Sequence, residues 1–245
     1  MTGAVHDPRG PTQADDDQPG HVRDGPGYAE LCVTSNFTFL TGASHPEELV
    51  LRAVELGLQA IAITDRNSLA GVVRAWSAMK TLRKQAETRL AVRSTRRIDP
   101  SSRQEFGPRR DLPCDPAARL PRLIVGARLV LRDGPVEWLA LPSDREAYHR
   151  LARLLTLGKR RAGKAECHLD LHDLEDGCQG MILIALPPRD LADAADPLRR
   201  LARRHPGRVF LGAAPRYDGS DQGWFDACAA LALRASTPMV AVGDV

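Results

Sequence analysis

The sequence predicts an α/β fold, either a β/α barrel or a doubly wound sheet, and two observations support this prediction. Strand-like and helix-like hydrophobic patterns alternate from residue 28 to residue 245, as expected for repeated β/α units. The segment "LQAIAIT" (58–64) is almost entirely apolar, which is typical of a strand covered on both faces in a parallel sheet. A chain of 245 residues is long enough to form one sizeable core.

The first elements have clear boundaries. The segment "YAELCV" (28–33) has the pattern of a short strand. A helix is expected from Ser44, which stands three residues before Glu47 as in a capping box and is followed by Pro46 in the first turn. Gly57 is the expected residue just past the end of this helix.

The same patterns predict the remaining elements. Apolar residues at helical spacing mark the helices, short apolar runs mark the strands, and Pro197 interrupts one helix. In chain order we expect a helix at 69–80, strands at 122–131 and 136–141, a helix at 144–158, a strand at 180–186, a helix at 189–205, a strand at 208–214, a helix at 221–236 and a last strand at 238–245 that ends at the chain terminus.

Two segments differ from this pattern. Residues 1–27 contain four prolines and five glycines, so we expect a disordered leader before one domain over 28–245. Residues 88–120 show no sustained period and are predicted to form a flexible surface insertion. From 83 to 120, ten Lys or Arg stand against five Asp or Glu. This basic excess could contact DNA weakly, but it contains only one aromatic residue, Phe106, so a surface loop is favoured.

The composition excludes several classes of protein. Hydrophobic residues make up 43% and charged residues 27% of the chain, and no apolar run approaches the roughly 18 residues of a membrane span. The N-terminus lacks the pattern of a secretory signal. The five cysteines are widely spaced and form no Cys-x-x-Cys pair, which favours reduced thiols. We therefore expect a soluble cytoplasmic protein with no membrane partner.

Three long segments carry a family resemblance: "SNFTFLTGASHPEELVLRAVELGLQAIAITDRNSLAGVVRA", "RLLTLGKRRAGKAECHL" and "VAVGDV". Together they make the chain resemble the PHP (polymerase and histidinol phosphatase) domain that opens bacterial DNA polymerases of the polymerase III alpha type, in their error-prone branch. The resemblance covers 28–245 apart from the insertion. It implies a PHP-type distorted (β/α)7 barrel, similar to a TIM barrel, and a parent DNA-directed DNA polymerase, a nucleotidyltransferase that acts in DNA replication, DNA repair and tolerance of DNA damage.

The resemblance also implies a metal site at the carboxyl ends of the strands, and most of its ligand positions are altered here. Only Asp65 and Asp244 keep the family's residue type. A threonine hydroxyl replaces an imidazole poorly, and an arginine repels a cation and cannot become a ligand. The altered positions are Cys32 and Thr34 in place of a His-x-His pair, Arg66, Trp76 and Arg128.

We therefore predict a vestigial metal site and no catalytic residue in this chain. Two carboxylates could hold Mg²⁺ or Mn²⁺ only weakly, through water molecules. Our hypothesis is that Arg66 and Arg128 form ion pairs with Asp65 and Asp244. The alternative for Asp65 is a helix cap, and the alternative for Cys32 is a buried thiol.

Two further clusters have a structural and a functional interpretation. Cys167, His168, His172 and Cys178 include common zinc ligands, but their spacing matches no common zinc finger, so we expect ordinary loop residues and no zinc. The loop "GKRRAGK" (158–164) could contact phosphates weakly or form a solvated turn. Its cations are Lys159, Arg160, Arg161 and Lys164.

The resemblance leads us to expect a structural or docking domain. Its partners would be polymerase domains C-terminal to this chain, DNA through the parent protein, and damage-tolerance proteins. One alternative is an active metal-dependent phosphoesterase or 3′–5′ exonuclease, and another is a free-standing domain that binds a partner protein. Because the chain ends where the family's next histidine would follow Asp244, we expect a truncated, split or fragmentary gene product.

Overall fold

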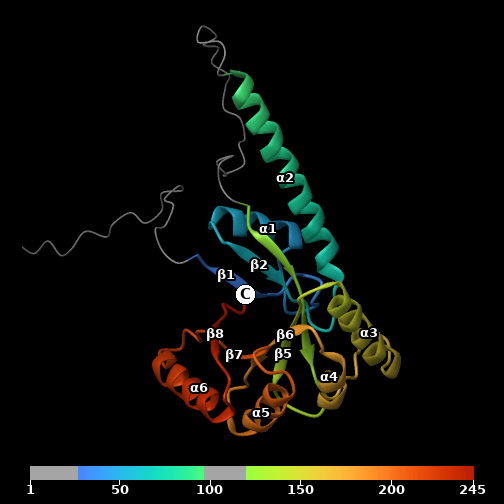
Figure 1. Cartoon of the computed structure of the whole chain (residues 1–245), viewed down its shortest axis with the longest axis vertical. Helices are drawn as coiled ribbons and strands as arrows, with labels where there is room; N and C mark the ends of the chain where they lie inside the picture. The colour runs from blue at the N-terminus through green and yellow to red at the C-terminus, as the bar shows by residue number, and fades with distance from the viewer. Residues whose placement is uncertain (1–26, 97–119) are drawn as a thin grey trace, which may run out of the picture.

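The computed structural model describes residues 27–96 and 120–245, and it contains two sheets (Figure 1). The first sheet has the order β1-β2-β3 and is parallel throughout. The second has the order β4-β5-β6-β7-β8. The strands are β1 (Ala29–Val33), β2 (Ala60–Ile63), β3 (Arg122–Val125), β4 (Ala127–Val130), β5 (Glu137–Pro142), β6 (Met181–Leu186), β7 (Val209–Ala213) and β8 (Met239–Ala241).

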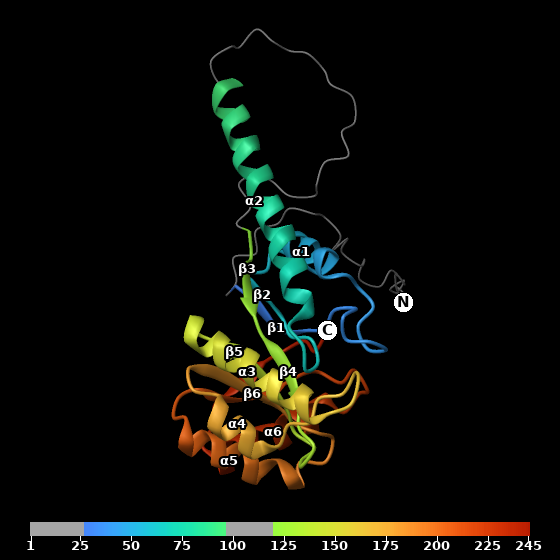
Figure 2. The ribbon, with the colours of Figure 1, turned by 90° about the vertical axis from the view of Figure 1, so that its right-hand side faces the viewer.

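The helices cover the outer faces of the sheets. The helices are α1 (Pro46–Glu55), α2 (Ala70–Arg96), α3 (Arg145–Arg161), α4 (Leu171–Gly177), α5 (Ala195–Arg204), which follows a short 3-10 turn at Ala192–Ala194, and α6 (Asp221–Ala235). The first two pack on the three-stranded sheet, and the other four surround the second sheet (Figure 1). Figure 2 shows that α2 continues well beyond the body of the molecule. None of the described helices is long and apolar enough to cross a bilayer.

The alternation of side chains in β2 explains why its sequence is apolar throughout. Ile61 and Ile63 pack toward α1 and α2, in one hydrophobic cluster. Ala62 points the other way, into an inner cluster that also contains Cys32 and Leu139 from other strands. Because both faces are covered, every position of this strand is buried.

The two sheets enclose this inner cluster and meet at two joints. At the first, β3 runs into β4 through Gly126, where a Cβ atom would lie 2.5 Å from Leu141 Cδ2. At the second, the Val245 backbone accepts from the Thr34 N–H at 2.6 Å and donates to the Cys32 carbonyl at 3.0 Å. The α/β fold is therefore as predicted, but the described strands are arranged as two sheets around a shared core and not as one closed sheet.

The direction of β5 departs from a TIM-like barrel. It runs antiparallel to both β4 and β6. The connection from Val130 to Glu137 forms a hairpin, because it is too short for a helical crossover to a parallel strand. This hairpin sets the register between Arg128 and Glu137, which places them as diagonal neighbours on one face of the sheet.

Several predicted boundaries are corrected. The cap of α1 is His45, not Ser44, and its backbone N–H donates to Glu48 at 2.8 Å, because Pro46 starts the helix and places the cap one residue later. The end of α1 is as expected, since Gly57 has a φ of 65°. The last strand stops at Ala241 rather than at the chain terminus, and beyond it Asp244 adopts a φ of 54°, which is not an extended conformation.

The helix α2 is much longer than predicted, and it includes the first part of the proposed insertion. It extends to Arg96, whereas the expected end was near Lys80. The intervening residues are mostly good helix formers and contain no glycine or proline. The rest of the insertion and the proposed leader up to residue 26 lie outside the described residues.

Candidate functional site: a charge network at the strand ends

The candidate site lies where β1, β2 and β4 meet the C-terminal segment of the chain. Arg128, the second residue of β4, lies beside the residues that follow β2, and its backbone N–H donates to the Asp65 carbonyl at 3.1 Å. The chain end lies next to Cys32 through the backbone bonds of Val245. Residues that are distant in the sequence are therefore brought to one place.

Arg128 is the centre of an ionic network. Its Nε donates to Glu137, and its Nη1 donates to Asp244 Oδ1 at 2.5 Å. Arg66 Nη2 lies 3.4 Å from the other Glu137 oxygen. Desolvation opposes the charge of Arg128, but the two carboxylates outweigh it, so the pKa of Arg128 is raised. Our ion-pair hypothesis is confirmed for Arg128 with Asp244, whereas Arg66 pairs with Glu137 and not with Asp65.

Cys32 contributes a neutral thiol to this network. It is fully buried, and its Sγ donates to Asp244 Oδ1 at 3.2 Å. Burial and the nearby Asp244 carboxylate raise the pKa of Cys32 far above its ordinary value. The group that could act as a ligand is the thiolate, and this environment disfavours it.

Asp65 is buried and serves as a hydrogen-bond acceptor for its surroundings. Its Oδ1 accepts from the Ser35 N–H at 2.9 Å and from the Thr38 hydroxyl at 3.0 Å. The Ser35 hydroxyl lies 2.8 Å from Oδ1 and 2.9 Å from Oδ2. The Gly71 N–H, in the first turn of α2, donates to Oδ2 at 3.2 Å. The carboxylate thus joins the loop after β1 to the start of α2, although α2 begins at Ala70 and Asp65 is not its N-cap residue.

The other altered positions lie outside these contacts. Trp76 is 56% exposed on α2, where its ring contacts Lys80. Thr34 takes part in the joint to the chain end through its backbone N–H. Neither side chain contributes a polar contact to the network around Arg128.

These residues do not fit a metal site. A guanidinium lies between two carboxylates, burial and Asp244 disfavour the thiolate of Cys32, and both Asp65 oxygens accept hydrogen bonds from the protein. Within residues 27–96 and 120–245, no group of three or more His, Cys, Asp or Glu side chains is placed to hold a metal ion. We therefore derive no chemistry through a metal.

The cysteine and histidine cluster of the sequence is not brought together. His168 contacts Glu166, and His172 contacts Asp176 on α4, a helix that we had expected to be a loop. Cys178 is buried 3.2 Å from His205, and burial raises the pKa of its thiol to about 11.

The basic loop is also more ordered than predicted. Lys159, Arg160 and Arg161 form the last turn of α3, where cations complement the helix dipole. Arg161 pairs with Asp173 at 2.6 Å. Lys164 lies just beyond the helix and is exposed.

Sequence reasoning missed the residues that complete the site. Ser35 and Thr38 are ordinary polar residues in sequence, and only their burial beside Asp65 reveals their role. Glu137 could have been found from the hairpin, because Arg128 pairs with Leu139 and the residue two positions away on β5 is its diagonal neighbour on the same face.

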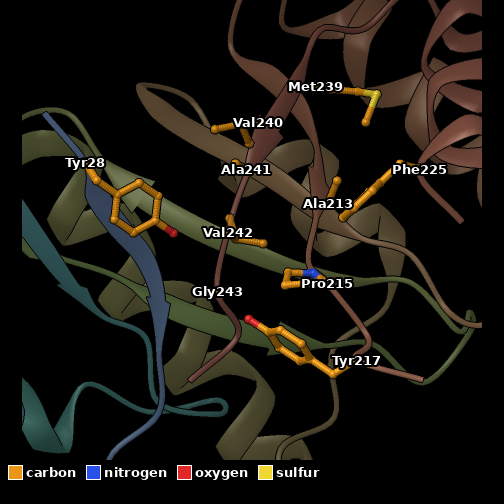
Figure 3. Close-up of a pocket in the computed structure, with 10 residues that line it drawn as sticks. All are labelled: Tyr28, Ala213, Pro215, Tyr217, Phe225, Met239, Val240, Ala241, Val242 and Gly243. Atoms are coloured by element: carbon orange, nitrogen blue, oxygen red, sulfur yellow. The ribbon is translucent and has the colours of Figure 1, made fainter. Parts of the chain in front are cut away.

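A pocket of about 420 Å³ is lined by Tyr28, just before β1, and mainly by residues of β7, β8 and the segments that follow them. Figure 3 shows Tyr28 and Tyr217 with their hydroxyl groups directed toward Gly243. The buried Glu30 binds two of the lining residues: its carboxylate accepts from the Gly243 N–H at 3.0 Å and from the Tyr28 hydroxyl at 2.8 Å. Burial and the bond to Glu30 raise the pKa of Tyr28.

Comparison with known proteins places this arrangement in a family. A family model described as the PHP domain matches residues 30–206. This chain belongs to the PHP domain family. The resemblance inferred from the sequence is thereby confirmed, and the two facing sheets are a PHP-type α/β fold.

The relatives of this PHP domain are much longer proteins. An error-prone DNA polymerase from Ruegeria pomeroyi is 68% identical over 89% of the chain, which corresponds to 20% of that relative. An error-prone DNA polymerase from Rhodopseudomonas palustris (strain BisB5) is 42% identical over 90% of the chain and 17% of the relative. The chain therefore spans about a fifth of the length of these proteins.

Solved structures share the fold of this PHP domain at low sequence identity. A proposed metal-dependent phosphoesterase from Bifidobacterium adolescentis has a TM-score of 0.53 at 15% identity, covering 89% of this chain and 87% of its own. An amidohydrolase from Chromobacterium violaceum has a TM-score of 0.51 at 13% identity, with the same coverage. These similarities concern the fold alone.

Proposed function

We propose that this chain is the PHP domain of an error-prone DNA polymerase and that the domain has a structural or docking role. The parent protein would extend DNA in damage-tolerant synthesis and repair, with its nucleotidyl-transfer residues and further polymerase domains outside this chain. The relatives named error-prone DNA polymerase, and the small fraction of each that the chain matches, support this assignment.

The single observation that carries the structural role is the position of Arg128. Its guanidinium contacts Asp244 and Glu137 and lies 3.9 Å from Cys32 Sγ. A fixed cation therefore neutralises the carboxylates at the strand ends, which in a metal site is the task of the bound ion. The ionic network links the two sheets, because Arg128 and Glu137 belong to the second sheet and Arg66, which pairs with Glu137, follows β2 of the first sheet.

The first test replaces this fixed cation. In Arg128→Ala, Asp244 and Glu137 lose their main partner while both remain partly shielded from water, so we expect the free energy of unfolding to fall by about 1–3 kcal/mol. The matched control is Arg132→Ala, whose side chain is 60% exposed and reaches its nearest carboxylate only at 4.0 Å. It should change stability by less than about 0.5 kcal/mol in the same urea titration.

The rival function is an active metal-dependent phosphoesterase or 3′–5′ exonuclease. Such an enzyme needs a metal-bound hydroxide near the phosphorus, so Mn²⁺ should induce hydrolysis that Asp65→Ala abolishes. We expect the purified chain to bind neither Mn²⁺ nor Zn²⁺ stoichiometrically and to hydrolyse no phosphodiester. Stoichiometric metal, or Mn²⁺-dependent hydrolysis that depends on Asp65, would contradict the structural proposal.

A further inference from the structure

The helix α2 has two different faces. The inward face is apolar and packs on the body through residues three or four positions apart, namely Gly71, Ala75, Met79 and Leu82. The opposite side is exposed, and we call it the outward face of α2. Among the exposed residues of this face are Val73, Trp76, Lys80, Arg83, Lys84 and Glu87.

The outward face combines unpaired cations with an exposed aromatic ring. Among the described residues, Lys80, Arg83 and Lys84 form no ion pair with a carboxylate. They lie within about 6 Å along the helix axis, because an α-helix rises about 1.5 Å per residue. Trp76 lies one turn before Lys80 and about two turns before Arg83 and Lys84, and Lys80 Nζ lies 5.4 Å from the centre of its ring.

This arrangement is unusual for a tryptophan that has only a structural role. The other two tryptophans, Trp138 and Trp224, are buried in the core of the second sheet. Trp76 contributes to none of the hydrophobic clusters and is more than half exposed. A large aromatic surface beside several cations is the combination that binds single-stranded nucleic acids, through base stacking and phosphate contacts.

We propose that the outward face of α2 binds a single strand of nucleic acid, with its three cations on phosphates and Trp76 stacked on an unpaired base. Charge complementarity selects a polyanion as the partner, and the exposed indole selects unpaired bases over a duplex. The site is separate from the network around Arg128, so this proposal does not rest on the structural role argued above.

The first experiment measures binding of a fluorescein-labelled oligothymidylate to the 245-residue chain by fluorescence anisotropy. Three phosphate contacts predict that the logarithm of the association constant falls against the logarithm of the salt concentration with a slope of about −2. The triple variant Lys80→Glu/Arg83→Glu/Lys84→Glu should weaken binding at least tenfold. All three positions are exposed, and circular dichroism verifies that the variant is folded.

The matched control reverses three other exposed cations, in Arg145→Glu/Arg153→Glu/Arg203→Glu on α3 and α5. It changes the net charge equally, so it should retain affinity within about threefold if the outward face is the binding surface. Equal losses in the two triple variants would indicate nonspecific charge attraction and would overturn the proposal. Failure of the oligonucleotide to bind at about 50 mM salt would also overturn the proposal. An acidic protein surface would then be the better candidate partner for the outward face.

The second experiment tests stacking. Trp76→Ala should weaken oligothymidylate binding by about tenfold, whereas Trp76→Phe should retain most of the affinity. Because the other tryptophans are buried, the oligonucleotide should quench the fluorescence of Trp76 selectively, and this quenching should be absent in Trp76→Ala. Unchanged affinity in Trp76→Ala, or equal affinity for a duplex of the same length, would refute the stacking part of the proposal.

Discussion

At Asp65, the donors around the carboxylate determine what the residue does. A carboxylate at the end of a buried strand is suited to bind a cation, and the sequence alone supports that interpretation. In the structure, hydroxyl and backbone donors from Ser35, Thr38 and Gly71 use its oxygens. Gly71 is required for this contact, because a Cβ atom there would lie 2.3 Å from Asp65 Oδ2. The residue type is that of a ligand, but its contacts are those of a structural acceptor.

Removal of this acceptor should be costly. In Asp65→Ala, the buried N–H and hydroxyl groups around the site lose their partner, so we expect the free energy of unfolding to fall by about 3 kcal/mol or more. Urea denaturation followed by circular dichroism measures the change. The control Asp226→Ala removes an exposed carboxylate on α6 and should cost less than about 0.5 kcal/mol. Similar stabilities for the two variants would argue against the structural role of Asp65.

The individual site residues show what a sequence can and cannot reveal. Comparison of Cys32, Arg66 and Arg128 with the expected ligands indicated that the site had changed. It did not indicate the new partners, because a side-chain contact depends on register and direction as well as residue type. Thus Arg128 pairs with Asp244 as predicted, whereas Arg66 pairs with Glu137. The position of Glu137 can be inferred only when the register of the β4–β5 hairpin is known.

At the scale of elements, local hydrogen bonds explain the unpredicted helix α4. Asp173 accepts from the Asp170 N–H at 3.0 Å, and the Leu171 N–H donates to Asp133 at 2.9 Å. These bonds satisfy backbone donors that the first turn of a helix leaves free. Arg161 then links the end of α3 to the same Asp173 carboxylate. The sequence "DLHDLEDG" is too short to show a helical period, so its caps are the better signal.

The Asp173 contacts predict a pH dependence. Burial opposes ionisation, but the bonds from Arg161 and from the Asp170 backbone outweigh it, so the pKa of Asp173 is lowered below 3.8. A lowered pKa in the folded state means that the stabilisation is present above the unfolded value and is lost as the pH falls through the folded value.

The matching variant is Asp173→Asn, which cannot ionise. At pH 7 it should be less stable than the wild type by up to about 1 kcal/mol, since Arg161 is half exposed and solvent screens the pair. The difference should narrow as the pH falls below the ordinary value of an aspartate and Asp173 becomes protonated in the folded state. Thermal unfolding across this range measures the effect, with Asp226→Asn as the exposed control. A difference that is independent of pH would show that ionisation of Asp173 does not contribute.

At the scale of the whole molecule, the alternation of strands and helices was predictable from the sequence, but the contacts that join the two sheets were not. Each strand or helix leaves a local hydrophobic pattern, and the buried strand β2 is a clear example. The joint between Cys32 and Val245 has no such pattern in the sequence, because it consists of backbone hydrogen bonds between residues far apart in the chain. The same holds for Glu30, a carboxylate in an apolar strand, which binds the N–H groups of Cys32 and Gly243.

This joint gives the last prediction. A Cβ atom at Gly243 would lie 2.3 Å from Glu30 Oε2, and the Glu30 carboxylate is held by three donors, so it cannot move without loss of hydrogen bonds. We expect Gly243→Ala to reduce the free energy of unfolding by about 1–3 kcal/mol. We also expect faster amide hydrogen exchange in β1 and the C-terminal segment than in β5 and β6, because the joint opens locally.

In the control Gly223→Ala, the added Cβ meets no atom within 4 Å, and the helical position should make the change neutral or slightly stabilising. Uniform exchange across both sheets in Gly243→Ala would mean that the chain end and β1 do not form an independent joint.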